Sequence, residues 1–401
     1  MPEANEQDKE MRRTEQRSAQ DRPESRRLLF VASLHHPKEL TDEIRATDRE
    51  DAPLFPRSME LFTWERAFRK AGYEADVFWR NLPGFGARDI ARLSNETFRT
   101  ALTPGKLITG LLQRIPPQFQ PDLRRRNQLL LEQARRYKPD LIWLAGANRE
   151  ILPDTLERLK REHNCKLLFI HGDSPIVFSH PNERAAAPLY DLVLVNDVYH
   201  GAQWRELGAK QVACLPYVAI DPEYHAPQPI TDVPNEYLCD LGFVGTLVPQ
   251  NLYSERVAVL ESLRDFDLGI WSVHDVPPSL KPFYRGYALG DSNLQVLSSV
   301  KICINTHGDT MRYGVNLRLF ECAALGSFQI VDDRPGVAEH FTVGEHLVTF
   351  GDLADLREKA RYYLAHDEER GRMAAAAREH VLAHHRYDQR VARVLELLGG
   401  C

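Results

Sequence analysis

The segment from Lys301 to Asp333 constrains the fold of this chain more than any other. Its sequence, KICINTHGDTMRYGVNLRLFECAALGSFQIVDD, predicts a buried strand, a polar loop, a short apolar helix and a second buried strand. The helix, residues 317–325, is apolar on almost every side, which is typical of a buried helix, yet it contains Glu321. An ionised carboxylate is costly to bury without a partner. Glu321 therefore pairs with Arg318, three residues earlier, or accepts hydrogen bonds from the hydroxyl groups of a ligand.

The composition restricts the class of protein. The chain has 401 residues, of which 43% are hydrophobic, enough for two domains of ordinary size. Its net charge of −6 argues against general binding to nucleic acid. No apolar run approaches the ~20 residues that a membrane-spanning helix needs. The first apolar run begins only at Leu28, behind a charged segment, so we expect no signal peptide.

The six cysteines form no Cys-x-x-Cys pair, and most lie in or beside apolar segments. This pattern is typical of small core residues in a reducing compartment, and it argues against a disulfide framework and a structural zinc site. We therefore expect a cytoplasmic protein.

Alternating strand and helix patterns divide the chain into two parts. Residues 1–26 are almost wholly polar and charged, and we predict a disordered tail. Strands and helices then alternate over residues 27–221. Residues 222–236 contain four prolines and suit a linker, and the alternation restarts at residue 237. This organisation predicts two α/β domains, each with a doubly wound parallel sheet.

Apolar runs and helical spacing locate the expected elements. The predicted strands are residues 28–34, 74–79, 140–144, 166–170, 191–195, 240–244, 268–271, 302–305, 328–331 and 346–350. The predicted helices are residues 59–71, 123–137, 153–162, 253–263, 293–300 and 317–325, followed by two helices after residue 350. Residues 82–120 have weak periodicity, and we predict loops and short helices there.

Polar residues follow several predicted strands, at the edge where open parallel sheets bind ligands. In the first domain, His171 and Asp173 follow one strand, and residues 33–36 follow another. His171 is either an ordinary structural histidine or a group that donates to a ligand hydroxyl or transfers a proton. Asp173 either caps the next turn or faces the same ligand.

Two strands of the second domain end in the same way. Gly245 and Thr246 follow the strand 240–244, and a later strand ends at Asn305, two residues before His307. Gly245 either makes an ordinary tight turn or lets backbone N–H groups approach a phosphate. Neither domain opens with G-x-G-x-x-G and there is no P-loop, which argues against a dehydrogenase. With the linker as a hinge, the strand ends of both domains can face one cleft.

The N-terminus of helix 317–325 is a candidate diphosphate site. Asn316 is a good N-cap, and aligned peptide dipoles place roughly half a positive elementary charge at such an end. We expect the backbone from Tyr313 and Gly314 to Asn316 to wrap a diphosphate, and Arg318 to add a cation.

This region resembles a known family. The stretch GVNLRLFECAALGSFQIVDD resembles the G-x-N-x-R-x-F-E-x-x-A-x-G signature of group 1 glycosyltransferases, in the branch named after the spore-maturation protein CgeB. The segment DLGFVGTL with Arg256 resembles the opening of that family's nucleotide-binding domain. Residues 337–370 resemble the stretch after the signature, and residues 384–398 resemble its terminal helix. The likeness extends over residues 240–398.

The resemblance implies a GT-B fold, in which two Rossmann-like domains face a cleft, and transfer of a sugar from a nucleotide-diphosphate donor. It implies that Glu321 accepts hydrogen bonds from ribose hydroxyls. The residues that it places near the diphosphate are Gly245, Thr246, Arg256 and Arg318. His171 is similar in placement to the histidine that touches the donor sugar in many such enzymes.

The resemblance also assigns the domains. Residues 27–221 form the acceptor-side domain, residues 237–383 bind the nucleotide sugar, and residues 384–401 pack back on the first domain. The chain departs from the pattern of many relatives, which carry two glutamates eight positions apart: Tyr313 stands where the first would be. The lysine that usually assists the diphosphate is not obvious either.

We expect a metal-independent enzyme without a cofactor, because helix N-termini and arginines can stabilise a departing diphosphate, and no Asp-x-Asp motif follows a predicted strand. The expected catalytic residues are His171, Asp173 and Arg318. The expected donor-binding residues are Gly245, Thr246, Arg256, Asn305, His307, Tyr313, Gly314, Asn316 and Glu321. The family likeness favours retention of the anomeric configuration.

Two other functions stay open: a nucleotide-sugar epimerase on the same fold, and a non-catalytic carbohydrate-binding or scaffold protein. The acceptor, whether a glycan, a lipid-linked glycan or a protein, is expected to meet residues 82–120. The arginines in and beside this stretch either contact an anionic acceptor or form a solvated surface. They are Arg80, Arg88, Arg92 and Arg99.

Overall fold

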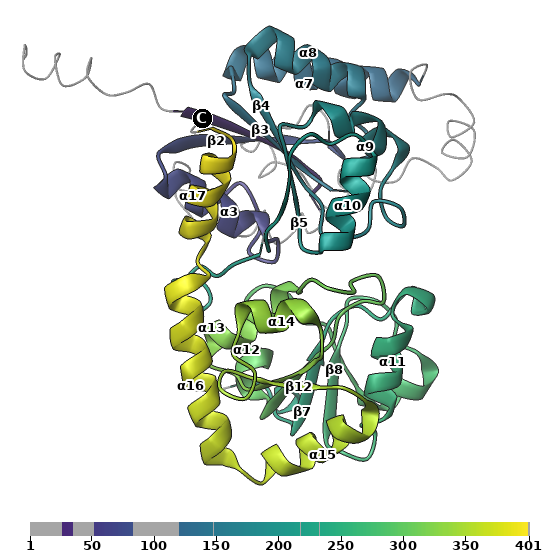
Figure 1. Ribbon diagram of the computed structural model, residues 1–401, viewed down its shortest axis with the longest axis vertical. Helices are drawn as coiled ribbons and strands as arrows, with labels where there is room; N and C mark the ends of the chain where they lie inside the picture. Colours follow the sequence, from purple (N-terminus) through teal and green to yellow (C-terminus); the bar gives the residue numbers. More distant parts are fainter. Residues whose placement is uncertain are drawn as a thin grey trace, which may run out of the picture.

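The computed structural model describes residues 26–34, 52–82, 120–146, 148–216, 218–231 and 233–399. Within these ranges the chain forms two α/β domains, one above the other in Figure 1. The predictions that lie outside the described residues concern residues 1–25, 35–36 and 83–119, with Arg88, Arg92 and Arg99.

The first domain is built on a sheet of six parallel strands. From edge to edge they are β2 (Tyr73–Trp79), β1 (Arg26–Ala32), β3 (Leu141–Ala145), β4 (Lys166–Ile170), β5 (Leu192–Val195) and β6 (Val212–Cys214). The strand order reverses between β1 and β3, because the chain passes from β1 out to β2 and then returns. A ligand crevice opens at the carboxyl ends of the strands at such a reversal.

Strand β1 shows that this sheet is buried on both faces. Leu28 and Phe30 belong to the core beneath α3 (Leu61–Lys70). Leu29 and Val31 belong to the core on the opposite face, which helices α7 (Pro121–Tyr137) and α8 (Pro153–His163) cover. All four side chains are fully buried. Since alternate side chains of a strand point to opposite faces, the continuous apolar run reflects a sheet covered on both sides.

The second domain repeats this plan with six parallel strands. In order they are β12 (Val348–Phe350), β11 (Gln329–Asp332), β10 (Ile302–Asn305), β7 (Leu241–Val244), β8 (Leu268–Trp271) and β9 (Tyr284–Gly286). Here the order reverses between β7 and β10. The prediction of two doubly wound parallel sheets is confirmed.

Helices cover the faces of both sheets. In the first domain they include α7 (Pro121–Tyr137), α8 (Pro153–His163), α9 (Pro181–Ala186) and α10 (Val198–Glu206). In the second domain they include α11 (Ser254–Glu261), α12 (Asp291–Ser299), α13 (Leu317–Leu325), α14 (Pro335–His340) and α15 (Leu353–Leu364). No helix in the described part of the chain is long and apolar enough to cross a membrane.

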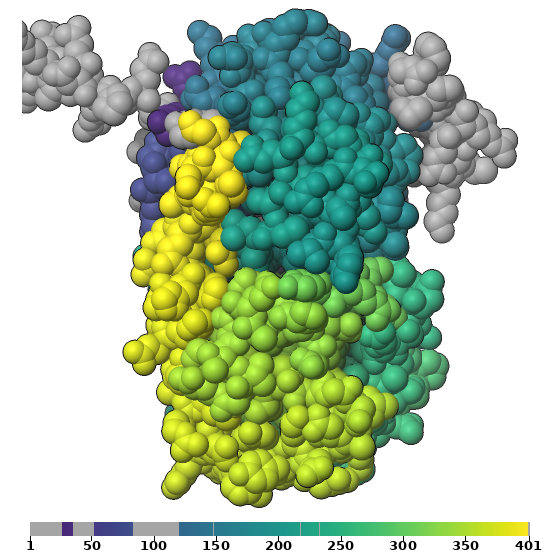
Figure 2. Space-filling view, viewed as in Figure 1, coloured from purple at the N-terminus to yellow at the C-terminus, as the bar shows by residue number. Residues whose placement is uncertain are grey.

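The last two helices, α16 (Asp367–His384) and α17 (Tyr387–Leu397), join the domains. They run along one side of both domains, in yellow in Figure 2. Tyr387 and Val391 of α17 lie in the first domain's core, beside α3. Two helices were predicted after residue 350, but α15, α16 and α17 make three.

The helical run breaks before α17 because the backbone around Arg386 pairs with Ile220, in the segment that joins the two domains. The N–H of Ile220 donates to the carbonyl oxygen of His385 at 2.8 Å, and the N–H of Tyr387 donates to that of Ile220 at 3.0 Å. Arg386 between them has extended backbone angles, φ −93° and ψ 154°. A helix cannot continue through such a residue.

Several histidine rings lie close together beside this break between α16 and α17. The ring centroids of His346 and His380 are 4.5 Å apart, and those of His340 and His385 are 5.5 Å apart. Burial, reinforced by the positive charge of Arg390, lowers the pKa of His340 to about 4 and that of His385 to about 3. Folding therefore makes these two histidines harder to protonate than they are in the unfolded chain.

Replacing His340 by phenylalanine should make the protein less sensitive to acid. In the wild type, His340 contributes stability that is present above its ordinary pKa of 6.5 and is lost as the pH falls towards 4. We expect the free energy of unfolding, measured in urea, to fall less for His340→Phe than for the wild type between pH 7.5 and pH 5, by more than about 1 kcal/mol. The exposed His384 supplies the control His384→Phe. Equal acid sensitivity in all three proteins would contradict the prediction.

Candidate active site

Arginine side chains brace the strand ends at both points where the strand order reverses. In the second domain, Nη1 of Arg256 donates to the carbonyl oxygen of Thr246 at 2.6 Å. Its Nε and Nη2 donate to Oγ1 and the carbonyl oxygen of Thr306 at 3.1 and 2.8 Å. The guanidinium also lies 4.7 Å from the ring centroid of Tyr253. All three nitrogens of Arg256 are thus bonded to protein oxygens, so this arginine fixes the two loops rather than offering a free cation to a diphosphate.

Arg80 has the same role in the first domain. Its Nε donates to Oγ of Ser33 at 2.8 Å, and its two Nη atoms donate to the carbonyl oxygens of Ala145 and Gly146 at 3.0 and 2.7 Å. Only 3% of this residue is exposed. The prediction that Arg80 contacts an acceptor or lies on a solvated surface is wrong, because its guanidinium is buried between the ends of β1 and β3.

Gly245 belongs to an ordinary strand end. Its N–H donates to the carbonyl oxygen of Trp271 at 3.0 Å. A Cβ atom at this position would come within 2.9 Å of the ring of Phe243. Close packing therefore accounts for the glycine, and its own amide is not available to a phosphate.

Side-chain amides fix α13 on the sheet. Oδ1 of Asn316 accepts a hydrogen bond from the N–H of Leu319 at 3.1 Å, which confirms the predicted N-cap. Nδ2 of Asn316 donates to Oδ1 of Asn305 at 2.8 Å. Asn305 in turn donates to Oε1 of Gln329, and Gln329 donates to the carbonyl oxygen of Leu319. Asn305 and Gln329 are almost fully buried, so Asn305 orients the helix from behind.

Glu321 is bonded to Arg318, the internal ion pair that the sequence left as an alternative. Nη1 of Arg318 also donates to Oδ1 of Asn293 at 2.8 Å. This pair uses only one carboxylate oxygen. The other, Oε1, has Nε2 of His225 at 4.0 Å, which is beyond hydrogen-bond distance. Glu321 is 6% exposed, so an acceptor atom is left at a nearly buried position.

His225 was not predicted as a site residue, because it lies in the segment expected to be a linker. It is 4% exposed and packs beside Glu321. Its Nδ1 accepts a hydrogen bond from the N–H of Asp221 at 3.0 Å, so Nε2 carries the proton of the neutral ring. Burial lowers the pKa of His225, although the carboxylates of Glu321 and Asp221 oppose this.

The loop before α13 contacts the first domain. The N–H groups of Arg312, Tyr313 and Gly314 donate to Oδ2 of Asp197, at the start of α10, at 2.9, 2.7 and 2.9 Å. The prediction that the amides of Tyr313 and Gly314 wrap a diphosphate is therefore corrected, because a protein carboxylate holds them in this structure. The hydroxyl of Tyr313 bonds to Glu339.

His307 also lies inside the strand-end network. Its Nδ1 is 2.6 Å from Oδ1 of Asp332, and its N–H donates to the same carboxylate. Burial works to raise the pKa of Asp332, but His307 and Arg334 outweigh it and hold the pKa below its usual value. The side chain of His307 is fully buried, so it supports the end of β10 from within.

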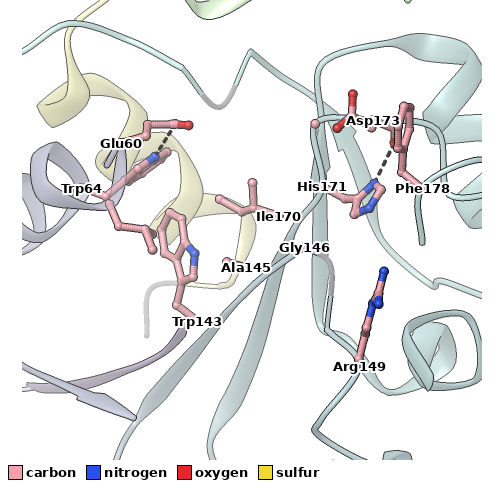
Figure 3. A pocket seen from close by; sticks show the side chains of 12 residues that line it. Glu60, Trp64, Trp143, Ala145, Gly146, Arg149, Ile170, His171, Asp173 and Phe178 are labelled. Carbon is pink, nitrogen blue, oxygen red and sulfur yellow. Dashed lines mark hydrogen bonds between the residues drawn. The ribbon is translucent and has the colours of Figure 1, made fainter. Parts of the chain in front are cut away.

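In the first domain, a cavity of ≈ 410 Å³ opens at the carboxyl ends of β3 and β4 (Figure 3). His171 and Asp173 both line it, as the sequence indicated. Nδ1 of His171 is 2.7 Å from the carbonyl oxygen of Asp173. A carbonyl only accepts, so Nδ1 carries the proton and Nε2 is left as an acceptor. The remaining lining residues are Glu60, Leu61, Trp64, Trp143, Ala145, Gly146, Arg149, Ile170, Gly172 and Phe178.

Glu60 and Arg149 give this cavity polar groups that were not predicted. Glu60 accepts hydrogen bonds from Nε1 of Trp64 at 3.1 Å and from the hydroxyl of Tyr387 at 3.3 Å. Burial raises the pKa of Glu60 to about 8. Arg149 extends beneath His171 in Figure 3. A helix that follows a parallel strand begins at the carboxyl edge of the sheet, and this rule would have pointed to Glu60 at the start of α3.

The cavity lies opposite the strand ends of the second domain. Burial is the main cause of the raised pKa of Glu60, and the negative charge of Glu321 raises that pKa further. Asp173 likewise adds to the burial that raises the pKa of Tyr253. Glu60 and Asp173 line the cavity, whereas Glu321 and Tyr253 belong to the second domain. Glu60 and Asp173 of the first domain thus lie near enough to Glu321 and Tyr253 of the second for their charges to interact.

Residues 256–396 match the family model described as "Glycosyl transferase-like". The fold resembles sucrose-phosphate synthase from Thermosynechococcus elongatus, with a TM-score of 0.59 and 13% identity over 93% of this chain and 98% of that one. These findings support a glycosyltransferase of the GT-B fold. No curated protein matches the sequence.

Two other solved structures share the GT-B fold. One is HepE from Anabaena, crystallised with UDP: the TM-score is 0.53 and the identity 13%, over 92% of this chain and 99% of that one. The other is a glycosyltransferase from Rickettsia africae, with a TM-score of 0.56 and 11% identity over 94% and 98% of the two chains. The predicted pair of Rossmann-like domains is confirmed.

Replacing Arg256 by lysine should loosen the strand ends of the second domain. Lysine keeps the charge but has one ammonium group, which cannot bond to Thr246 and to both oxygens of Thr306 in this geometry. We expect the free energy of unfolding to fall by about 2 kcal/mol. The exposed Arg264, just beyond the same helix, supplies the control Arg264→Lys. If both variants match the wild type in urea unfolding, the bracing role is wrong.

Proposed function

We propose that this protein transfers a sugar from a nucleoside-diphosphate donor to an acceptor. The observation that carries this proposal is the position of α13. Its N-terminus lies at the point between β7 and β10 where the strand order reverses. The helix carries Arg318 and Glu321, and it lies opposite a cavity that His171 lines. The match of residues 256–396 to a glycosyltransferase-like family supports the same function.

Glu321 and Arg318 bind the two parts of the nucleotide. Oε1 of Glu321 accepts hydrogen bonds from the ribose, while the bond to Arg318 holds the other oxygen. The first N–H groups of a helix have no partner within it, and in the described residues those of Leu317 and Arg318 stay unbonded. Together with the helix dipole they attract the diphosphate. HepE, which has this fold, was crystallised with UDP and with UDP-glucose.

The cavity of the first domain receives the sugar and the acceptor. Nε2 of His171 accepts a hydrogen bond from a hydroxyl there, because Nδ1 is held by the carbonyl of Asp173. The carboxylate of Asp173 orients the acceptor or the transferred sugar. Closure of the two domains excludes water and limits hydrolysis of the donor.

Departure of the diphosphate needs positive charge, which Arg318 and the N-terminus of α13 supply without a metal ion. The resemblance of residues 240–398 to the CgeB-like branch supports the proposal that the enzyme belongs to that branch and retains the anomeric configuration. The acceptor is a glycan, a lipid-linked glycan or a protein, and the reaction then belongs to glycan biosynthesis in the cytoplasm.

A panel of nucleoside diphosphates tests the proposal. We expect UDP, GDP or TDP to raise the melting temperature of the wild type, because a ligand that binds only the folded state stabilises it. The corresponding nucleotide sugar is then incubated with and without candidate acceptors. An altered sugar without an acceptor would indicate an epimerase. No stabilisation by any nucleotide would indicate a scaffold protein and would contradict the proposal.

Glu321→Gln should lose most of its affinity for the stabilising nucleotide. Glutamine has nearly the same shape but no charge, and hydrogen bonds to charged groups are the stronger ones. We expect the dissociation constant for that nucleotide, measured by calorimetry, to rise by about tenfold or more. Glu379→Gln, on the exposed face of α16, is the matched control. Wild-type affinity in a folded Glu321→Gln protein would remove Glu321 from the site.

A further inference from the structure

Residues of the first domain at the start of α10 form hydrogen bonds with the loop that precedes α13. Oδ2 of Asp197 accepts three hydrogen bonds from consecutive N–H groups, those of Arg312, Tyr313 and Gly314. Its other oxygen accepts a hydrogen bond from the N–H of Tyr199 at 2.8 Å, which caps α10. Asp197 is fully buried. Burial works to raise its pKa, but the amides of Gly314 and Tyr313 outweigh it and hold the pKa below its usual value.

A second side chain of α10 holds the same loop. Nε2 of His200 is 3.1 Å from the carbonyl oxygen of Thr310, so this nitrogen carries a proton and donates. His200 is 1% exposed. One helix of the first domain thus bonds to both the N–H and the C=O groups of the loop. Because the partners are backbone atoms, the contact fixes the path of the loop whatever its side chains are.

The two backbones meet without a gap. A Cβ atom on Gly314 would lie 2.0 Å from the carbonyl oxygen of Asn196. Any other residue at position 314 would push the loop away from α10. Gly314 opens the GVNLRLFE motif that leads into α13, so the close approach of the domains occurs two residues before the cap of that helix.

We propose that Asp197 and His200 are positioning residues, which hold residues 310–314 and thereby set the N-terminus of α13 in the closed cleft. This inference rests on the proposed function, in which α13 binds the donor diphosphate. Asn316 lies two residues after the held loop and caps α13. A loop released from α10 would leave this cap, and the N–H groups after it, less well oriented.

The alternative is that Asp197 occupies a phosphate site and blocks it. Consecutive amides do form concave anion sites. However, Oδ1 of Asp197 is committed to its own helix, and the contact between Gly314 and Asn196 leaves no space for a phosphate. The two ideas predict opposite changes in nucleotide affinity when the charge is removed.

The test compares Asp197→Asn with a matched control. Asp352 also accepts hydrogen bonds from two backbone N–H groups, at the start of α15, away from the cleft. Asp352→Asn therefore makes the same chemical change at a cap that does not join the domains. Two measurements are made on full-length protein: hydrogen exchange of residues 310–316, and the dissociation constant for whichever of UDP, GDP and TDP binds the wild type.

We expect Asp197→Asn to speed exchange over residues 310–316 and to weaken nucleotide binding by about tenfold or more. We expect Asp352→Asn to change neither. Gly314→Ala tests the same contact without altering either side chain, and it should weaken nucleotide binding in the same direction. It also serves if Asp197→Asn does not fold.

Three results would overturn the inference. Unchanged nucleotide binding in both cleft variants would show that the contact is only structural. Tighter binding in Asp197→Asn would show that the carboxylate competes with phosphate. If the wild type binds none of the nucleotides, the proposed function fails and this inference fails with it.

Discussion

The bond between Arg318 and Glu321 is the interaction on which the candidate site depends. Both residues lie on α13, whose residues from Leu319 to Leu325 are all buried. Removing two charges from water costs energy that their mutual attraction only partly restores. Here the pair is also incomplete: among the described residues, Oε1 of Glu321 has no hydrogen bond and Nε of Arg318 is buried without a partner. A buried donor without a partner calls for an explanation, and a polar ligand that also reaches the open oxygen of Glu321 supplies one.

The other polar residues of the site form hydrogen bonds that hold this pair at the cleft. Asn316 and Asn305 tie α13 to the sheet, and Arg256 ties together the loops at the switch point. In the first domain, Arg80 does for β1 and β3 what Arg256 does for β7 and β10. These residues bond mainly to backbone carbonyls and to side-chain amides. They keep the strand ends rigid, so that a small number of groups are left facing the ligand.

The fold could be predicted from the sequence because its strands are continuous apolar runs. Strands β8 and β10 and helix α13 have the predicted bounds. Strands β6 and β9 were missed, since each has only three residues and lies at the edge of its sheet. Such strands are too short to show a periodic pattern. Two helices were predicted after residue 350, whereas α15, α16 and α17 make three.

The candidate site was predictable in its location but not in its bonding. The rule on strand ends placed His171 and Asp173 at a cavity. It did not show that the nitrogens of Arg256 would all bond to oxygens of Thr246 and Thr306. Backbone carbonyl groups occur at every residue, so the sequence does not indicate which of them will accept a hydrogen bond. The same rule also applied to Asp197, which lies two residues after the end of β5. Its role was missed because the three amides that it accepts from belong to the other domain.

The central claim is that the open oxygen of Glu321 accepts a hydrogen bond from the ribose of a nucleoside diphosphate. The most direct test compares a nucleoside diphosphate that binds the wild type with an analogue that lacks both ribose hydroxyls. The comparison is made by calorimetry on the wild type and on Glu321→Met, whose side chain is of similar length but accepts no strong hydrogen bond. The account predicts that losing the hydroxyls weakens binding to the wild type by about tenfold or more and barely affects the variant. Equal losses in the two proteins would contradict it.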